Sequence, residues 1–137
     1  MKYMNIAIEE AKLASEEGNV PVGCVIVKNN EVLATTHNTK NTSNIAINHA
    51  EILAIMEASK KLNSWYLNEC DLYVTLKPCE MCMAAIGEAR IGKVYYLLDS
   101  NYENNLSENI NKIELIKLDE DTNYNVLISN FFKEIRK

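Results

Sequence analysis

Two periods of hydrophobic and polar positions run along this chain, and they predict where its helices and strands lie. Over residues 2–17, apolar side chains recur every three or four positions, beginning with Met4 and Ala7, and most charged side chains fall between them. That period is typical of an amphipathic helix with one face on a core. Gly18 follows at the position where such helices commonly end.

A β-hairpin is predicted next, because the period changes. Residues 20–27 are hydrophobic and rich in β-branched side chains, Asn29 and Asn30 form a turn sequence, and 31–37 continues as a second extended segment. Two such segments around a two-residue turn are typical of a hairpin.

A second helix is predicted over 49–62, after a polar, turn-rich loop at 38–48, with Asn48 as its N-cap. Ile52, Ile55, Met56 and Ser59 are expected along one face of this helix. A strand over 71–76, a helix over about 79–88 and a strand over 93–98 are expected next. A polar connector at 99–112, with a short helix near 107–111, leads to a strand over 113–118. A last helix, capped by Asp121 or Thr122, follows. This order predicts a three-layer α/β/α fold with a central five-stranded mixed sheet. The helix over 79–88 is apolar nearly all round, so we expect a second subunit to provide part of its cover.

The composition indicates one soluble globular domain over residues 1–137, with 47% hydrophobic and 24% charged residues. No apolar run approaches the roughly 20 residues of a membrane helix, and the early Glu9 and Glu10 are not typical of a signal peptide. A cytoplasmic, reducing location is therefore expected, where four cysteines are metal ligands or buried side chains rather than disulfides. The net charge of −5 gives no general attraction to nucleic acid but leaves room for a local basic patch.

Cys79 and Cys82 are the centre of the chemistry that the sequence predicts. They lie three positions apart after Pro78, at the start of a predicted helix, so their Cβ atoms share one face at about 5–6 Å. That spacing lets two thiolates bind one zinc ion, and the free N–H groups of a helix start favour the thiolate. His49 and Glu51 complete the pattern His-x-Glu followed by Pro-Cys-x-x-Cys, in which the His is a ligand and the Glu is an acid–base group.

A closed structural site would need a fourth ligand, and Cys70 is the alternative. We expect it some 20 Å from Cys79, because the strand between them advances about 3.3 Å per residue. Cys24 lies within a predicted strand and His37 at a strand end, so both are expected to be packing or loop residues. Three protein ligands leave the fourth position open, which is the catalytic arrangement of zinc.

Such a site activates water. Zinc lowers the pKa of a bound water, and Glu51 would take its proton. Attack on an amidine carbon, such as C6 of adenine or C4 of cytosine, then releases ammonia as Glu51 protonates the ring nitrogen and the leaving amine.

On these residues the chain resembles the cytidine deaminase superfamily, and within it the bacterial tRNA adenosine deaminases. The likeness runs from the first helix to Tyr96 and returns at 131–133 in the last helix. The segments that carry it are 20–23, 37–38, 49–52, 72–76, 78–82 and 89–92.

The resemblance implies that His49, Cys79 and Cys82 bind one Zn²⁺ per subunit, that Glu51 shuttles protons and that Asn38 hydrogen-bonds the target nucleotide. An Asn after a strand is also a common turn residue. The resemblance further implies a homodimer whose partner is a tRNA anticodon loop, with the wobble adenosine unstacked and converted to inosine.

Three features depart from the family pattern. Lys77 stands where Glu usually precedes the Pro-Cys pair, the loop before His49 lacks the usual proline, and the short connector at 99–112 contains no glycine.

The acidic composition and the short connector favour an alternative, a deaminase of free guanine or of a cytosine base or nucleoside. A third possibility is a non-catalytic, zinc-stabilised partner subunit, and the intact Glu51 argues against it. Support for the RNA substrate comes from basic residues near the expected pocket mouth and in the tail: Lys40, Lys77, Lys133, Arg136 and Lys137.

Overall fold

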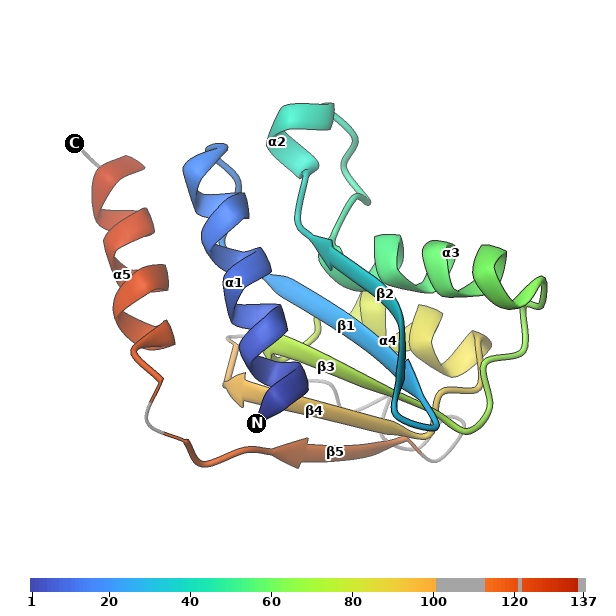
Figure 1. The fold of residues 1–137 in the computed structure, drawn as a ribbon. Helices are drawn as coiled ribbons and strands as arrows, with labels where there is room; N and C mark the ends of the chain where they lie inside the picture. The colour runs from blue at the N-terminus through green and yellow to red at the C-terminus, as the bar shows by residue number, and fades with distance from the viewer. Residues whose placement is uncertain (101–112, 121, 136–137) are drawn as a thin grey trace.

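The computed structural model describes residues 1–100, 113–120 and 122–135, and Figure 1 shows its elements. The helices are α1 (Lys2–Glu16), α2 (Lys40–Ser43), α3 (Ala50–Leu62), α4 (Glu80–Glu88) and α5 (Tyr124–Ile135). The strands are β1 (Gly23–Lys28), β2 (Glu31–His37), β3 (Cys70–Leu76), β4 (Lys93–Leu98) and β5 (Glu114–Lys117). Each corresponds to a predicted element except α2, and the helix expected near 107–111 lies outside the described residues. None of the helices in the described ranges combines the length and apolarity that crossing a bilayer demands.

The five strands form one mixed sheet, as predicted, and their order in it is β2-β1-β3-β4-β5. β1 pairs antiparallel with β2 and β3, whereas the β3–β4 and β4–β5 pairs are parallel. The predicted two-residue turn joins β1 to β2. Its residues, Asn29 and Asn30, have φ angles of 50° and 64°. This left-handed conformation is what such a turn requires and what Asn tolerates.

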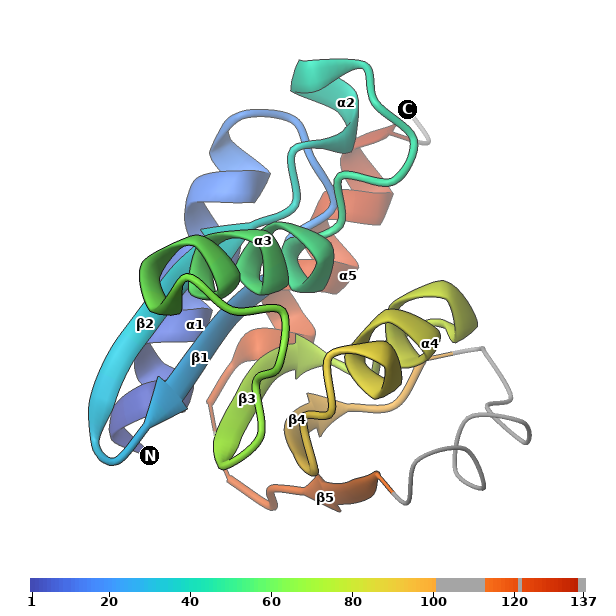
Figure 2. The same ribbon diagram turned by 90° about the vertical axis from the view of Figure 1, so that its right-hand side faces the viewer.

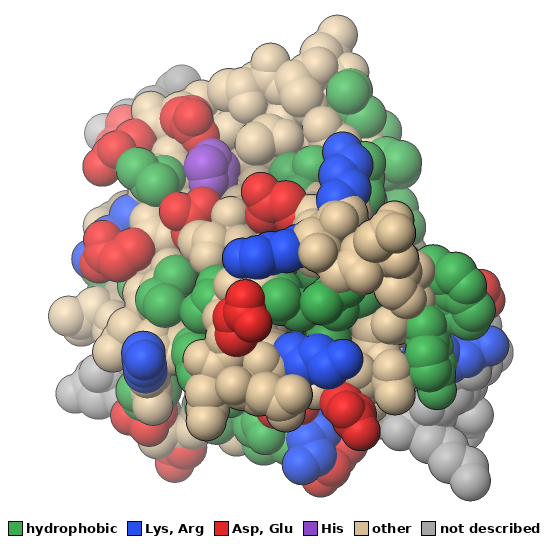
Figure 3. Space-filling view, turned by 45° about the vertical axis from the view of Figure 1, so that its right-hand side comes forward, with side chains coloured by type: hydrophobic (Ala, Val, Ile, Leu, Met, Phe, Trp, Pro, Cys, Tyr) green, Lys and Arg blue, Asp and Glu red, His purple; other side chains and the backbone are tan. Residues whose placement is uncertain are grey.

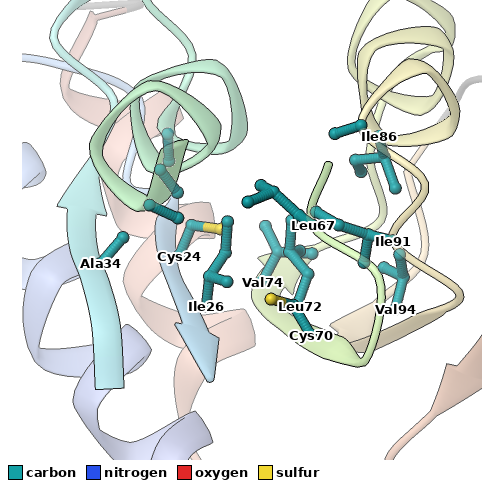
Figure 4. Close-up of a cluster of buried hydrophobic side chains, with 14 of the residues drawn as sticks. Cys24, Ile26, Ala34, Leu67, Cys70, Leu72, Val74, Ile86, Ile91 and Val94 are labelled. Atoms are coloured by element: carbon teal, nitrogen blue, oxygen red, sulfur yellow. The ribbon is translucent and has the colours of Figure 1, made fainter. Parts of the chain in front are cut away.

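Two helical layers enclose the sheet, with α1 and α5 on one face and α3 and α4 on the other (Figures 1 and 2). Successive residues of β1 point to opposite layers. Cys24 and Ile26 belong to the core beneath α3 and α4, which Figure 4 shows, and Val25 and Val27 belong to the core beneath α1 and α5. A strand buried on both faces has no polar alternation, which explains the continuous apolar run in this part of the sequence.

The backbone of α1 approaches β1 most closely at Gly23. A Cβ at this position would lie 1.8 Å from the Ala7 carbonyl oxygen and 2.8 Å from the Ala11 backbone nitrogen. The Gly23 N–H also donates a hydrogen bond to Thr75 Oγ1 at 3.2 Å. Any larger residue would therefore push α1 away from the sheet.

The face of α3 that packs on the sheet consists of alanines rather than of the stripe described in the sequence. Its buried apolar residues are Ala50, Ala54 and Ala58, whereas Met56 is 50% exposed. Of the expected stripe, Ile55 packs at the edge of the core. The small alanine side chains let the helix lie close to the strands, while Ile55 and Leu62 pack at the edge of the core and Met56 turns outward.

The loop before α3 also differs in detail. One helical turn, α2, interrupts it, and His49 rather than Asn48 occupies the N-cap position of α3. The Asn48 side chain instead donates a hydrogen bond to Ser43 Oγ at 2.9 Å. At the start of α5, Thr122 Oγ1 accepts a hydrogen bond from the Tyr124 N–H at 3.4 Å, while Asp121 lies outside the described residues.

His37 joins β2 to α1 through two carboxylates. Its Nδ1 lies 2.9 Å from Glu10 Oε1 and its Nε2 lies 2.5 Å from Glu17 Oε1. Burial alone would lower the pKa of His37, but the hydrogen bonds and charges of the two glutamates raise it above its usual 6.5. The prediction that His37 is a packing or loop residue fits this structural pairing.

We expect this pairing to make the stability of the fold depend on pH. Because the folded-state pKa of His37 is raised, its contribution is complete below about pH 6.5 and is lost as pH rises through the folded pKa. Wild type should exceed His37→Gln in free energy of unfolding by about 1 kcal/mol at pH 5.5, a value reduced by solvent screening. Urea denaturation at pH 5.5, 7 and 8.5 measures the difference. A difference that stays constant over this range would contradict the charged pairing.

Candidate metal centre and its pocket

Three candidate ligand atoms meet between the starts of two helices. His49 is the N-cap residue of α3, Cys79 is the N-cap residue of α4, and Cys82 lies in the first turn of α4. The His49 Nδ1 atom lies 3.7 Å from Cys79 Sγ and 3.5 Å from Cys82 Sγ, and all three atoms are within 4.8 Å of one another. The structure thus brings together the three residues that the sequence analysis selected as ligands.

Local hydrogen bonds fix both helix starts. Thr36 Oγ1, at the end of β2, donates to the Ala50 carbonyl at 2.7 Å and so ties the first turn of α3 to the sheet. The Cys79 carbonyl accepts the first helical hydrogen bond of α4, from the Met83 N–H at 2.9 Å. Cys79 and Cys82 therefore sit on a regular first turn, with their sulfurs on the side that faces His49.

The separations fit one tetrahedral zinc ion. With Zn–N near 2.0 Å and Zn–S near 2.3 Å, tetrahedral geometry places a nitrogen and a sulfur ligand about 3.5 Å apart. Both N–S distances agree with this value.

Cys70, the alternative fourth ligand, begins β3 at the opposite end of the strand from Cys79 and is buried in the core that Figure 4 shows. Among the described residues, the cluster holds three ligands and leaves one coordination position for a substrate or water.

Glu51 lies buried beside this cluster, with 4% of its surface exposed. Burial raises the pKa of its carboxyl group to about 7, and the nearby charge of Cys79 adds to that effect. The interaction with His49 and a hydrogen bond from Cys82 act in the opposite direction. A carboxyl group with a pKa near neutrality can both accept and return a proton.

The two cysteines have very different proton affinities. A hydrogen bond from Cys82 is the main cause that lowers the pKa of Cys79 to about 4, and His49 contributes to the same shift. The pKa of Cys82 is raised by its hydrogen bond to Cys79 and by burial. Cys79 is thus prepared as a thiolate ligand, and a bound cation would favour the thiolate at Cys82 as well.

A pocket of about 460 Å³ opens onto the cluster and is lined by His49, Glu51 and Cys79 at its base. Apolar side chains form its walls, among them Val20, Val22, Leu76 and Leu98 from the sheet side. Ile128, Ser129 and Phe132 line it from α5. The tail that the sequence analysis selected at 131–133 therefore reaches the pocket through Phe132.

Asn38 lies at the edge of this pocket and is held by its surroundings. Its Nδ2 donates to the Val20 carbonyl at 3.2 Å, and its Oδ1 accepts from the Lys40 N–H at 2.9 Å. The second of these bonds is the turn interaction that Asn commonly makes after a strand. One Nδ2 hydrogen and one Oδ1 lone pair remain for a ligand.

Asn19 is a positioning residue that the sequence analysis missed. It is completely buried, and its Oδ1 accepts from the backbone N–H groups of Asn41 and Thr42 at 2.9 and 3.1 Å. Its Nδ2 donates to Thr42 Oγ1 at 3.2 Å. These bonds hold α2 against the end of α1, and α2 carries Lys40 to the pocket. An Asn directly after a helix-ending glycine gave only the signal of an ordinary turn.

Comparisons with known proteins agree with this geometry. The family described as "Cytidine and deoxycytidylate deaminase zinc-binding region" matches residues 1–98. The chain is 39% identical to a tRNA-specific adenosine deaminase of Bacillus subtilis (strain 168), over 98% of this chain and 89% of that protein. It is 40% identical to a tRNA-specific adenosine deaminase of Aquifex aeolicus (strain VF5), over 98% of this chain and 94% of that protein. A structure solved in biochemical and structural studies of A-to-I editing by tRNA:A34 deaminases superposes with a TM-score of 0.79 at 33% identity, covering 85% of this chain and 97% of that one.

Replacing Asn19 should loosen α2 without touching the cluster. We expect Asn19→Ala to lower the free energy of unfolding by about 2 kcal/mol, because two part-buried hydrogen bonds, each worth about 1 kcal/mol, are lost. Amide hydrogen exchange should speed up at Asn41 and Thr42, the two groups that Asn19 accepts from. Asn41→Ala, which removes a single bond from an exposed side chain to the Gly18 carbonyl, is the matched control. Unchanged exchange at Asn41 and Thr42 would show that Asn19 does not hold α2.

Proposed function

The chain belongs to the cytidine and deoxycytidylate deaminase zinc-binding family, and on that basis we propose that it is a zinc-dependent hydrolytic deaminase that converts adenosine to inosine at the wobble position of tRNA. The observation that carries the proposal is the His49, Cys79 and Cys82 cluster with buried Glu51 beside it at the base of a pocket. Relatives about 40% identical over nearly the whole chain are tRNA-specific adenosine deaminases.

In this proposal His49, Cys79 and Cys82 hold one Zn²⁺. When bound, zinc would supply the Lewis acid that makes a water molecule acidic near neutral pH. Glu51 would accept one proton from that water and pass it to the ring nitrogen of the base. It would then take the second proton, from the hydroxyl group added to the ring carbon, and pass it to the leaving amine, so that ammonia departs. Its burial and its pKa near 7 support this double role.

The shape and lining of the pocket suit a flat nucleobase as its ligand. Its walls are mainly apolar, and its volume of about 460 Å³ falls within the usual range for small-ligand sites. Asn38 hydrogen-bonds the target nucleotide through the donor and acceptor capacity that its turn leaves over. Phe132, 36% exposed where α5 borders the pocket, offers an aromatic face to an unstacked nucleotide.

Two other functions have less support than deamination of tRNA. A deaminase of free bases or nucleosides would use the same cluster, and nothing in the cluster itself separates it from an RNA deaminase. The relatives favour RNA, since those 39% and 40% identical over nearly the whole chain are tRNA-specific adenosine deaminases. A non-catalytic zinc subunit gives no reason to bury Glu51 beside the metal ligands at the cost of raising its pKa.

We further propose that residues 1–137 form one domain that works as a homodimer in the cytoplasm. The buried face of α4 carries Cys82, Met83, Ile86 and Gly87. On its other face Met81 is 37% exposed and Ala84 is also exposed, so a second copy would cover the side that the sequence analysis expected to be buried. All four cysteines are free thiols, in keeping with a reducing compartment.

Incubation of the purified protein with an anticodon stem-loop containing a wobble adenosine tests the substrate directly. We expect inosine in the RNA by mass spectrometry and no turnover of free adenine, adenosine, guanine, cytosine or cytidine. Turnover of the small molecules alone would refute the RNA substrate. Glu51→Gln, the matched control, should lower the rate by about 10²–10⁴-fold, the usual contribution of a general acid–base group, while retaining one zinc per chain. Activity that survives in Glu51→Gln would refute the proton-transfer role.

A charge on the open face of α4 should disrupt the proposed dimer. Met81→Asp places an unpaired carboxylate where a second copy would bury the methionine, so we expect monomers in sedimentation equilibrium. Glu88→Asp, also on an exposed position of α4, should leave the dimer intact. Wild type that sediments as a monomer, or a Met81→Asp variant that remains dimeric, would contradict this interface.

A further inference from the structure

Lys77 occupies a position of the pocket that the proposed reaction leaves without a role. It follows the last residue of β3 and precedes Pro78 and the ligand Cys79. Its backbone N–H donates to the Leu98 carbonyl at 2.9 Å, which extends the parallel pairing of β3 and β4 beyond the strand end. The Cα of Lys77 is therefore fixed two residues away from a metal ligand.

The Lys77 side chain lines the same pocket as His49, Glu51 and Cys79. Its ammonium lies 6.0 Å from the centroid of the Tyr96 ring, over the ring face. Stacking on an aromatic face holds a cation in place but does not neutralise its charge.

No carboxylate in the described part of the chain forms an ion pair with Lys77. Asp99 is the acidic residue at the pocket that could do so, and it pairs with Lys117 at 2.7 Å. Glu51 lies at the base of the pocket, beside the metal ligands. Asp99 interacts with the charge of Lys77, but more weakly than with Lys117, so Lys77 presents at the pocket a positive charge that no ion pair among the described residues neutralises.

This charge is local rather than part of a broad basic surface. The chain has a net charge of −5, and on the face shown in Figure 3 the basic side chains are scattered among acidic ones. A free purine or nucleoside carries no anion for Lys77 to meet. In a polynucleotide, a phosphate flanks the target nucleotide on each side, and the base must leave its stack to enter such a pocket.

We propose that Lys77 binds a backbone phosphate next to the deaminated nucleotide and is a specificity-determining residue for RNA over free bases and nucleosides. This inference rests on the proposed function and assigns part of its substrate recognition. Because the base points to the cluster while its backbone stays at the mouth, a lysine anchored beside Cys79 is placed to reach the phosphate.

Steady-state kinetics at several KCl concentrations test Lys77 with the anticodon stem-loop. Lys77→Met keeps the length of the side chain and removes the charge. We expect its KM to rise about three- to tenfold with kcat changed less than twofold. The slope of log(kcat/KM) against log[KCl] should become shallower by about 0.7, the value for one phosphate contact on a single strand. Lys77→Arg should retain the wild-type slope, because a guanidinium also binds phosphate.

Lys93→Met is the matched control, because Lys93 is exposed at the start of β4, the end of that strand remote from Leu98 and the pocket. It should leave both the slope and KM unchanged. Wild-type activity on the stem-loop with an unaltered salt slope in Lys77→Met would overturn the role of Lys77 and leave the proposed function standing. Loss of zinc or of kcat in Lys77→Met would show a structural role beside Cys79 and would also overturn it. Failure of the wild type to deaminate RNA refutes the proposed function itself.

Discussion

The approach of the first turns of α3 and α4 to one another is the constraint on which the rest of the structure depends. Residues 30 and 33 positions apart in the chain must bring one nitrogen and two sulfurs within bonding distance of a single ion. The sheet makes this possible, since β1 and β3 pair directly and carry the two helices on the same face. The hydrogen bond from Thr36 to Ala50 and the close contact of α1 at Gly23 fix that arrangement from both sides of the sheet.

The pocket draws on both helical layers. The layer of α3 and α4 supplies the ligand cluster and Glu51, whereas α5 in the opposite layer supplies Phe132 and Ile128. The phenolic O–H of Tyr124 donates to the Pro21 carbonyl at 2.6 Å in a buried position, which anchors the start of α5 to the chain just before β1. Asn38, held at both ends of its amide, meets a ligand with its rotamer already fixed. Such ordering removes a cost of about 0.5–1.5 kcal/mol that a mobile side chain would add to binding.

Much of the fold followed from local signals in the sequence. The alternation of periods located the main helices and strands, and the paired asparagines identified the turn between β1 and β2. The metal ligands could be found because Cys79 and Cys82 are three residues apart and a short motif surrounds His49. The face of α3 that packs on the sheet could not be predicted in this way. Alanine contributes little to a hydrophobic stripe in the sequence, yet its small size decides how closely a helix can approach a sheet. Asn19 escaped for another reason: its partners lie 22 and 23 positions away, and no local period records such contacts.

The late position of α5 in the chain has a consequence for biosynthesis. Glu51 and the three residues of the ligand cluster all lie before residue 83. The pocket wall that α5 contributes comes from residues 124–135. Protein domains emerge from the ribosome with their N-terminal parts first. The ligands of the metal centre are therefore all synthesised before the helix that closes one side of the pocket, so the order of synthesis leaves the ligand cluster accessible from that side until α5 has emerged.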